Sequence, residues 1–227
     1  ATGDYNTCAI KDNGDVYCWG RNGNGQLGNG QTSQVNTGCG VSGHKCKDVP
    51  TLTHVKGSNN YDAVSLAFGD RHACALLDDG DVVCWGRNNA GQLGTSGGDK
   101  DTPQAINLGT GRTATSIYAG GNFNCAILDD ASVKCWGHNN AGQLGIGSQV
   151  NTNTPTTINS LGSGRTAVTL ALAHHSMCAL LDDGSVKCWG ANHQGQLGNG
   201  GSPSLLTSPP SSAIDLGTGR TAKAITG

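Results

Sequence analysis

The sequence predicts an all-β protein, a β-propeller built of four tandem blade repeats of about 50 residues each. A gap-free motif of the type CALLDDGSVKCWGANHQGQLG occurs four times, at residues 8–28, 74–94, 125–145 and 178–198. The chain has 37 Gly among 227 residues, one Met, two Phe and no Glu, a composition that disfavours helices. We therefore treat residues 1–227 as a single repeat domain, either a closed small propeller or part of a larger one.

Each repeat contains a β-hairpin. In the fourth copy, two short β-type runs flank Asp182-Asp183-Gly184, and three loop residues ending in Gly suit a type I turn closed by a bulge. This loop places Cys178 opposite Cys188. Directly opposed Cα atoms lie roughly 4.5–5.5 Å apart, within the range of a disulfide. In the third copy Ala131 replaces the Gly, so that turn is expected to be strained or of another type.

The cysteines indicate an oxidising compartment. The predicted pairs are Cys8–Cys18, Cys74–Cys84, Cys125–Cys135, Cys178–Cys188 and, between the remaining two, Cys39–Cys46. Local pairing thus accounts for all ten, as in secreted proteins. The alternative is that they are small buried residues of a cytosolic protein. The sequence has no initiating Met, no signal-peptide hydrophobic region and no apolar run of about 18 residues. Together with the cysteines, this predicts a mature extracellular protein, or an excised portion of one, without a membrane span.

A further strand is expected before each hairpin. Alternating apolar segments occupy residues 63–67, 114–118 and 167–171. The chain stops at residues 224–227 inside a further occurrence, whereas the first repeat lacks such a segment. Strands from the two ends of the chain could therefore pair and close a ring, which would remove exposed edges. A cut from a longer chain explains the same pattern, and the sequence leaves both interpretations open.

The most regular residues of the repeats are expected to form the blade core. These residues are Trp19, Trp85, Trp136, Trp189, Leu27, Leu93, Leu144 and Leu197. We predict that the tryptophans pack between neighbouring blades and that the GQLG segments are structural turns whose Gln bonds loop backbone. An exposed tryptophan ladder for carbohydrate is the alternative.

Several residues suggest sites that we weigh against structural roles. The pairs Asp78-Asp79, Asp129-Asp130 and Asp182-Asp183 fit hairpin turns better than catalysis or calcium binding, because they recur in the repeats. Arg112, Arg165 and Arg220 recur too, which favours bonds to carbonyls of a neighbouring blade. His174-His175, His193 and His44 could suggest a metal, but adjacent strand residues point to opposite faces. We predict no metal, no cofactor and no enzyme activity.

Residues 29–48 form the one insertion that interrupts the repeat pattern. Unique loops on a rigid repeat scaffold are common recognition sites, and the Cys39–Cys46 pair would stiffen this one. The candidate partner-binding residues are Val41, His44, Lys45 and Lys47. A tolerated insertion without function is the alternative. The net charge of −2 gives no reason to expect nucleic acid as a partner.

The CWG-x-N-x-x-GQLG half of the repeat resembles the regulator-of-chromosome-condensation repeat. The resemblance implies blades of four antiparallel strands, most often seven per propeller, and functions from guanine-nucleotide exchange and chromatin binding to enzyme inhibition and extracellular scaffolding. The cysteine pairs argue against nucleotide exchange. We expect a non-enzymatic extracellular scaffold that binds a protein partner or another copy of itself. Such a scaffold could serve as a structural subunit of an extracellular assembly. The alternative is a secreted recognition protein, either a carbohydrate-binding lectin or an enzyme inhibitor.

Overall fold

The structure is a computed structural model that describes residues 1–31, 45–53, 55, 61–201 and 203–227. Every regular element in these ranges is a strand. The strands are β1 (Asn6–Ile10), β2 (Val16–Arg21), β3 (Cys46–Thr53), β4 (Ala63–Phe68), β5 (His72–Leu77), β6 (Val82–Gly86), β7 (Lys100–Ala105), β8 (Ala114–Gly120), β9 (Phe123–Leu128), β10 (Val133–Gly137), β11 (Thr152–Thr157), β12 (Ala167–Leu172), β13 (Ser176–Leu181), β14 (Val186–Ala191) and β15 (Leu205–Leu206).

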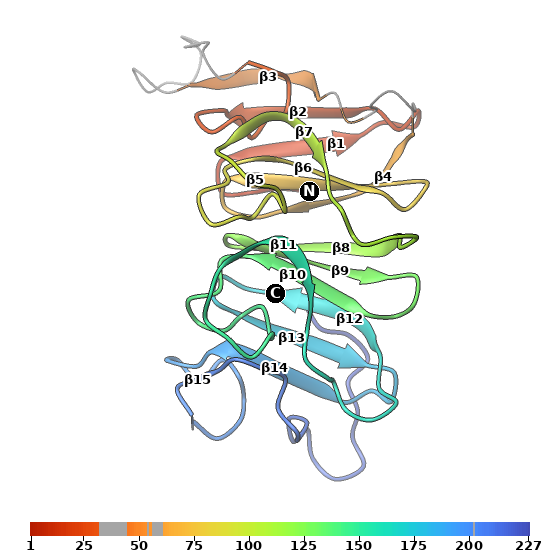
Figure 1. Ribbon diagram of the computed structural model, residues 1–227, viewed down its shortest axis with the longest axis vertical. Helices are drawn as coiled ribbons and strands as arrows, with labels where there is room; N and C mark the ends of the chain where they lie inside the picture. The colour runs from red at the N-terminus through yellow and green to blue at the C-terminus, as the bar shows by residue number, and fades with distance from the viewer. Residues whose placement is uncertain (32–44, 54, 56–60, 202) are drawn as a thin grey trace.

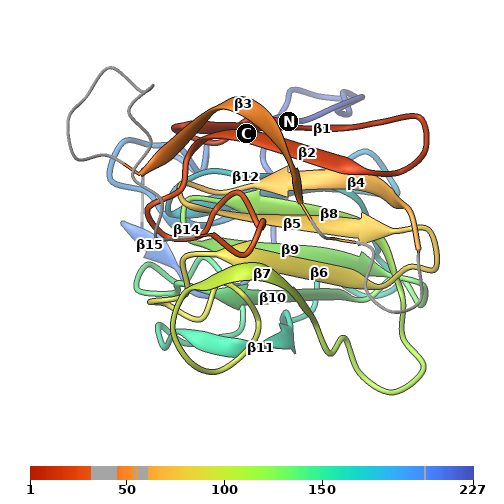
Figure 2. The ribbon, with the colours of Figure 1, turned by 90° about the horizontal axis from the view of Figure 1, so that it is seen from above.

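The strands form four antiparallel sheets, one per repeat. Their orders are β1-β2-β3, β4-β5-β6-β7, β8-β9-β10-β11 and β12-β13-β14-β15. Figure 1 shows the four sheets stacked along the long axis of the molecule, and Figure 2 shows the same stack from above. The inner strands β4, β8 and β12 lie against one another in the stack. The predicted all-β blade architecture is therefore confirmed, with a three-stranded first sheet.

The central hairpin of each sheet has the predicted register. Cys178 pairs with Cys188, Ala179 with Lys187 and Leu180 with Val186. Each of the four hairpins carries its own disulfide, with Cα–Cα distances of 4.0 to 4.1 Å. Of the predicted fifth pair, Cys46 begins β3, and Cys39 lies outside the described residues.

The third hairpin keeps the common turn despite its Ala. Ala131 has a φ of 63°, and its N–H donates to the Leu128 carbonyl at 3.0 Å. Gly80 has a φ of 85° and makes the equivalent bond to Leu77. The turn is therefore strained, as expected, and not of another type. Its conformation is that of the other copies, and Ala131 adopts a left-handed backbone that residues with a Cβ rarely adopt.

Ala131→Gly is expected to raise the free energy of unfolding. The left-handed conformation costs a residue with a Cβ about 1–2 kcal/mol, whereas Gly costs about 0.4–1 kcal/mol in unfolded-state entropy. The net gain should be about 0.5–1 kcal/mol, measured by denaturant titration. The matched control is Gly80→Ala, whose Cβ would lie 2.6 Å from the Thr113 Cβ and should destabilise. A destabilised Ala131→Gly variant would contradict this expectation.

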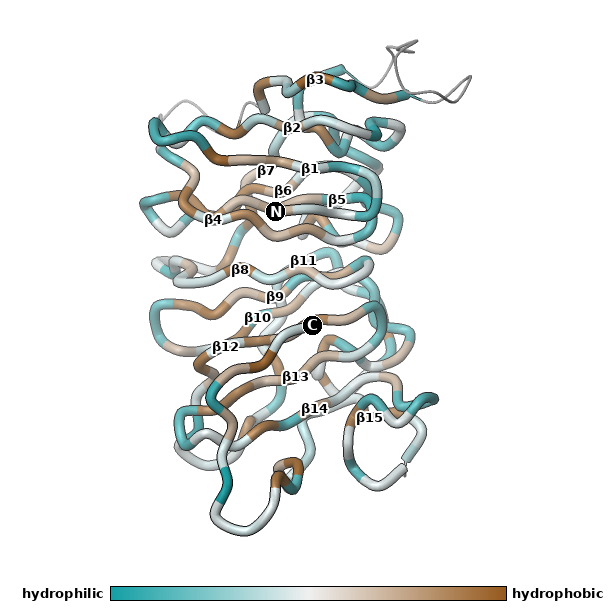
Figure 3. The backbone as a smooth tube through the Cα atoms, turned by 180° about the vertical axis from the view of Figure 1, so that it is seen from behind, coloured by the Kyte–Doolittle hydropathy of each residue, from teal (hydrophilic) through white to brown (hydrophobic). Residues whose placement is uncertain are grey.

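The core lies between the sheets. Three of its clusters combine buried residues of two neighbouring sheets: one, for example, contains Cys84 and Leu93 together with Ile117, Leu128 and Trp136. Figure 3 shows that hydrophobic segments follow the strands while the connecting turns are mostly hydrophilic. Each sheet is therefore stabilised mainly by its neighbours in the stack, as in other repeat proteins.

The stack is an open arc, and the closed small propeller is the wrong one of the two alternatives. The first and fourth sheets lie at opposite ends of the stack, and β1 is an edge strand (Figure 1). The strand expected at residues 224–227 forms no ladder. Instead the Ala222 N–H donates to the Gly184 carbonyl at 2.8 Å, as Ala114 donates to Gly80. The segment 222–227 thus lies against the fourth sheet in the position of a next inner strand.

Candidate functional site

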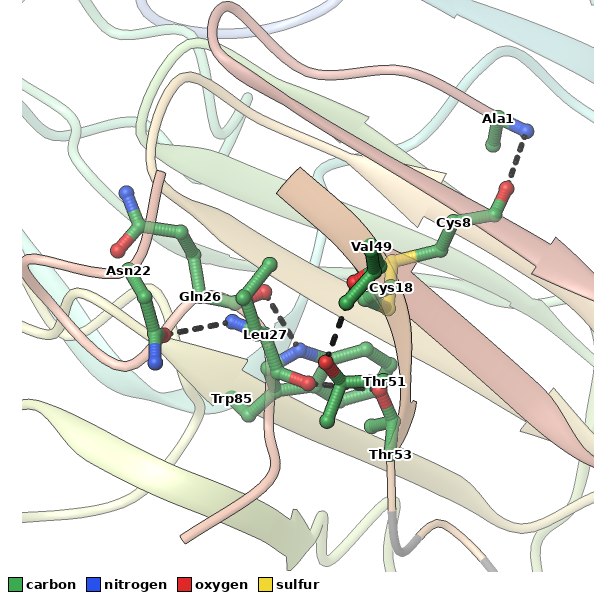
Figure 4. Close-up of a disulfide and its surroundings, with 10 residues drawn as sticks. All are labelled: Ala1, Cys8, Cys18, Asn22, Gln26, Leu27, Val49, Thr51, Thr53 and Trp85. Carbon is green, nitrogen blue, oxygen red and sulfur yellow. Dashed lines mark hydrogen bonds between the residues drawn. A yellow bond between two sulfur atoms is a disulfide. The ribbon is translucent and has the colours of Figure 1, made fainter. Parts of the chain in front are cut away.

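The contact between neighbouring sheets is built from the GQLG turn of one repeat and the tryptophan of the next. Figure 4 shows this contact between the first two sheets. The Asn22 Oδ1 accepts a bond from the Leu27 N–H at 3.0 Å, which fixes the turn. The indole N–H of Trp85 then donates to the Gln26 carbonyl at 3.0 Å. The turn therefore positions both an apolar side chain and a hydrogen-bond acceptor for the next sheet.

The same contact recurs along the stack. In the next interface the Trp136 N–H donates to the Gln92 carbonyl at 3.1 Å. The Trp189 ring is equally buried, although its N–H has no hydrogen-bond partner. The four predicted core leucines and three of the tryptophans are at most 1% exposed. Trp19 differs, because it lies half-buried on the outer side of the first sheet.

These burials leave no exposed tryptophan ladder. Trp85, Trp136 and Trp189 have an exposed fraction of 0%. A carbohydrate-binding surface made of stacked indole rings is therefore unsupported.

The Asp pairs and arginines lie together at the hairpin-turn end of the sheets. Arg112 contacts Asp129 and Asp130 at 3.6 and 2.9 Å, and Arg165 makes the equivalent contacts in the fourth sheet. The expected bonds from these arginines to backbone carbonyls are therefore wrong, since carboxylates accept them. Hydrogen bonds from Ser132 are the main reason that the pKa of Asp130 falls to about 2. These carboxylates therefore stabilise the hairpin turns by accepting hydrogen bonds within them.

The opposite end carries side chains that differ from repeat to repeat. We name the residues Asp70, Asn122, His138, His174 and His175 the turn cluster. They come from the turns between the first two strands of the second, third and fourth sheets and from the end of β10. The Asn122 amide donates to Asp70 at 3.2 Å, and His174 Nε2 lies 3.4 Å from the same carboxylate. The His138 and His175 rings are 5.6 Å apart.

The turn cluster has a mixed electrostatic character. Partial burial raises the pKa of the Asp70 carboxyl, while the neighbouring His174 opposes that shift. Burial lowers the pKa of His138, and the nearby His175 lowers it further. His174 and His175 themselves are exposed. The cluster can therefore offer imidazole donors and a carboxylate acceptor to a partner surface.

Beneath the turn cluster lies one buried histidine. His72 is fully buried, and its Nε2 lies 2.9 Å from Asn124 Oδ1. The Asn124 amide nitrogen donates to the Gln92 carbonyl, so its oxygen faces the ring and the His72 Nε2–H is the donor. Nδ1 has no partner. Desolvation therefore lowers the pKa of His72 to about 4.

The predicted partner-binding insertion is only partly described. Val41 and His44 lie outside the described residues. Lys45 precedes β3, and Lys47 pairs with Gly20 inside that strand, so the outer strand begins within the predicted insertion 29–48. Lys45 and Lys47 thus belong to the edge of the first sheet, whereas the turn cluster comes from the second, third and fourth sheets.

The histidine pair does not have the geometry expected from the sequence. His174 and His175 lie in the turn between β12 and β13, not in a strand, and their rings are 6.0 Å apart. The expectation that they point to opposite faces of a sheet is therefore wrong. Within the described part of the chain, no group of three or more His, Cys, Asp or Glu side chains could hold a metal ion.

Comparison with known proteins places the chain in a family. The regulator of chromosome condensation (RCC1) repeat matches residues 13–76, 79–127 and 130–180, and a second description of the same repeat matches 63–92, 114–143 and 175–196. The chain belongs to the RCC1 repeat family. Among curated relatives, the RCC1 domain-containing protein RUG3, mitochondrial, of Arabidopsis thaliana is 33% identical over 213 residues, 92% of this chain and 45% of the relative.

Solved RCC1-type structures have the same fold. Human WBSCR16 matches with a TM-score of 0.78 and 20% identity, over 95% of this chain and 52% of that protein. Prp20p of Saccharomyces cerevisiae, described with its binding to Gsp1p and histones, matches with a TM-score of 0.76 and 21% identity over 99% and 52%. The chain thus spans about half the length of these relatives. In the described residues no helix is long and apolar enough to cross a bilayer.

Proposed function

We propose that this RCC1-repeat chain is a non-enzymatic extracellular scaffold that binds a protein partner through the turn cluster. The observation that carries the proposal is the contrast between the two ends of the sheets. At the hairpin-turn end, the third and fourth repeats carry the same Asp and Arg side chains, which bond one another. At the other end, a unique set of imidazole, amide and carboxylate groups gathers from three sheets.

Support for a protein partner comes from the chemistry of this surface and from the family. Side chains that vary on a rigid repeat scaffold are where specific recognition usually lies. Prp20p binds Gsp1p and histones, and a second structure has yeast Prp20 bound to Kap60. Gsp1p, histones and Kap60 are partners of Prp20p and are not assigned to this chain. For this chain we infer only the class of partner, a protein.

The extracellular part of the proposal rests on the disulfides. Four hairpins each have a local disulfide, a density typical of proteins that mature in an oxidising compartment. Alkylation of the natural protein before reduction tests this part by mass spectrometry. We expect the eight hairpin cysteines to remain unmodified. Free thiols at these positions in freshly isolated protein would refute extracellular maturation.

The partner surface is tested by comparing double variants at the two ends of the sheets. His174→Ala with His175→Ala removes the exposed rings of the turn cluster, and Arg112→Ala with Arg165→Ala is the matched control at the hairpin-turn end. Each variant is immobilised, and proteins captured from the surrounding medium are quantified. We expect the histidine variant to lose partner binding about tenfold, or about 1.4 kcal/mol, while the control retains it. Equal binding by both variants would contradict the proposal.

A further inference from the structure

Two imidazole rings of the turn cluster meet across the interface between the third and fourth sheets. His138 directly follows β10, and His175 directly precedes β13. The ring centroids are 5.6 Å apart, and the ring planes are tilted by 53°. Both of the sheets that contribute a ring are part of the described stack, so the two residues belong to an internal interface. We name His138 and His175 the histidine pair.

A buried glutamine fixes the tautomer of His138. The Ala141 N–H donates to Gln143 Oε1 at 3.0 Å, so it is the amide nitrogen of Gln143 that lies 2.9 Å from His138 Nδ1. This nitrogen can only donate, which makes Nδ1 the acceptor and leaves the proton of the neutral ring on Nε2. Within the described residues this Nε2–H has no hydrogen-bond partner. His138 therefore offers one donor that is fixed in position.

The second ring of the pair has no bond of this kind. Asn122 stands at the position of His175 in the third sheet, since the carbonyl of each accepts from the N–H of the residue after the hairpin. The Gln92 amide donates to Asn122 across the preceding interface at 3.1 Å, whereas Gln143 bonds His138 of its own repeat. In the described part of the chain the exposed ring of His175 therefore makes no hydrogen bond.

The histidine pair can carry one positive charge. Burial lowers the pKa of His138, and the nearby His175 lowers it further, so His138 stays neutral when His175 takes up a proton. A carboxylate between the rings would accept the Nε2–H of His138 and pair with a protonated His175, which is a charge-assisted contact. Imidazole side chains change charge between about pH 8 and 5. Because such binding is coupled to proton uptake, the affinity rises as the pH falls through this range.

The surrounding charges do not already fill this site. The charged and titratable side chains around the pair are His174 in the same turn, Asp70 in the turn between β4 and β5, Asp4 and Arg71 beside Asp70, and His193 in the loop after β14. The Asp70 carboxylate accepts from the Asn122 amide at 3.2 Å and lies 3.4 Å from His174. The one carboxylate of the turn cluster is thus bonded to other groups, and it does not take the place of an external acceptor between His138 and His175.

We propose that the histidine pair binds a carboxylate of the protein partner, and that protonation of His175 strengthens this contact. The inference rests on the proposed function, because it names the chemistry of the partner that the turn cluster recognises: an acidic side chain of a protein. A neutral or basic segment lacks the acceptor that the His138 Nε2–H and a charged His175 require. Recognition is therefore stronger in a mildly acidic medium than at neutral pH.

The experiment measures binding of an acidic peptide to the 227-residue chain by calorimetry at about pH 7.5 and about pH 5.5. The probe is an end-blocked peptide of alternating Asp and Ser, since Asp stays ionised at both values. A peptide of alternating Asn and Ser is the uncharged control. We expect the acidic peptide to bind about tenfold more tightly at the lower pH, and the control peptide to bind at neither.

Substitutions taken from the other repeats make the test specific. His175→Asn introduces the residue found at Asn122 and should abolish the increase in affinity at low pH. His138→Arg introduces the residue found at Arg87, whose charge does not titrate, so this variant should bind at both pH values with little difference between them. His193→Asn removes an exposed imidazole outside the pair and is the matched control, which should bind like the wild type.

The outcomes separate this inference from the proposed function. Absence of acidic-peptide binding at low pH, or equal binding of the two peptides, would overturn the inference, and so would a His175→Asn variant that keeps the pH dependence. Capture of proteins from the medium still decides the proposed function in that case. Peptide binding that behaves as expected without any captured protein would support the inference and contradict the proposed function alone. Circular dichroism at both pH values establishes that each variant is folded.

Discussion

Trp136→Ala should lower the free energy of unfolding by about 3–5 kcal/mol, the usual cost of emptying a large buried aromatic site. Trp136 has an exposed fraction of 0% and packs with Leu93 and Ile106 of the preceding sheet. The substitution also removes the hydrogen bond to the Gln92 carbonyl. The loss therefore falls on the interface between two sheets, which is the main stabilising contact of the arc.

The matched control for this prediction is Trp19→Ala. Trp19 is only half-buried, so the loss should be smaller, about 1–2 kcal/mol. Urea titration followed by circular dichroism measures both values. Equal losses for the two variants would show that interface packing does not determine the stability of the stack.

Lowering the pH from about 6.5 to about 4 should destabilise the protein through His72. The pKa of His72 is lowered to about 4 in the folded chain, from 6.5, because burial disfavours the imidazolium. Between these values the unfolded chain binds a proton that the folded chain does not, so stability falls as the pH falls. The contribution is about 3 kcal/mol, fully lost near pH 4.

His72→Phe isolates this contribution. Phe123 occupies the equivalent position in the third sheet and is fully buried. This position of the sheet can therefore accommodate an aromatic ring that does not titrate. Unfolding free energies of both proteins are compared between pH 7 and pH 4. The difference between wild type and variant should change by about 3 kcal/mol over this range. A constant difference would mean that His72 does not titrate as its burial requires.

The hairpins were predictable from the sequence because their determinants are local. The three-residue loop ending in Gly184 fixes the register, and the register places Cys178 opposite Cys188. The burial of Leu93 and Trp136 followed from their recurrence at fixed offsets. The strained turn at Ala131 was also visible, because one residue departs from a pattern that the other copies keep.

The open arc and the turn cluster could not be predicted in the same way. Whether four sheets close depends on the rotation between neighbouring sheets, which side-chain packing sets and no single repeat encodes. Asp70 and Asn122 are 52 positions apart and meet only when the second and third sheets stack. The sequence shows that the turn between the first two strands of each sheet carries different side chains in successive copies. It does not show that these side chains contact one another, because those contacts form only when the sheets are stacked.

The disulfide across each hairpin has a consequence for the response to proteases. The bridge from Cys74 to Cys84 encloses the turn at Asp78-Asp79-Gly80, which is the most accessible part of the second hairpin. A protease that cleaves this turn leaves the two fragments covalently joined, and both remain held in their ladder. The polypeptide would appear whole without reductant and as fragments with it. A nick at the exposed end of a blade therefore does not release the blade.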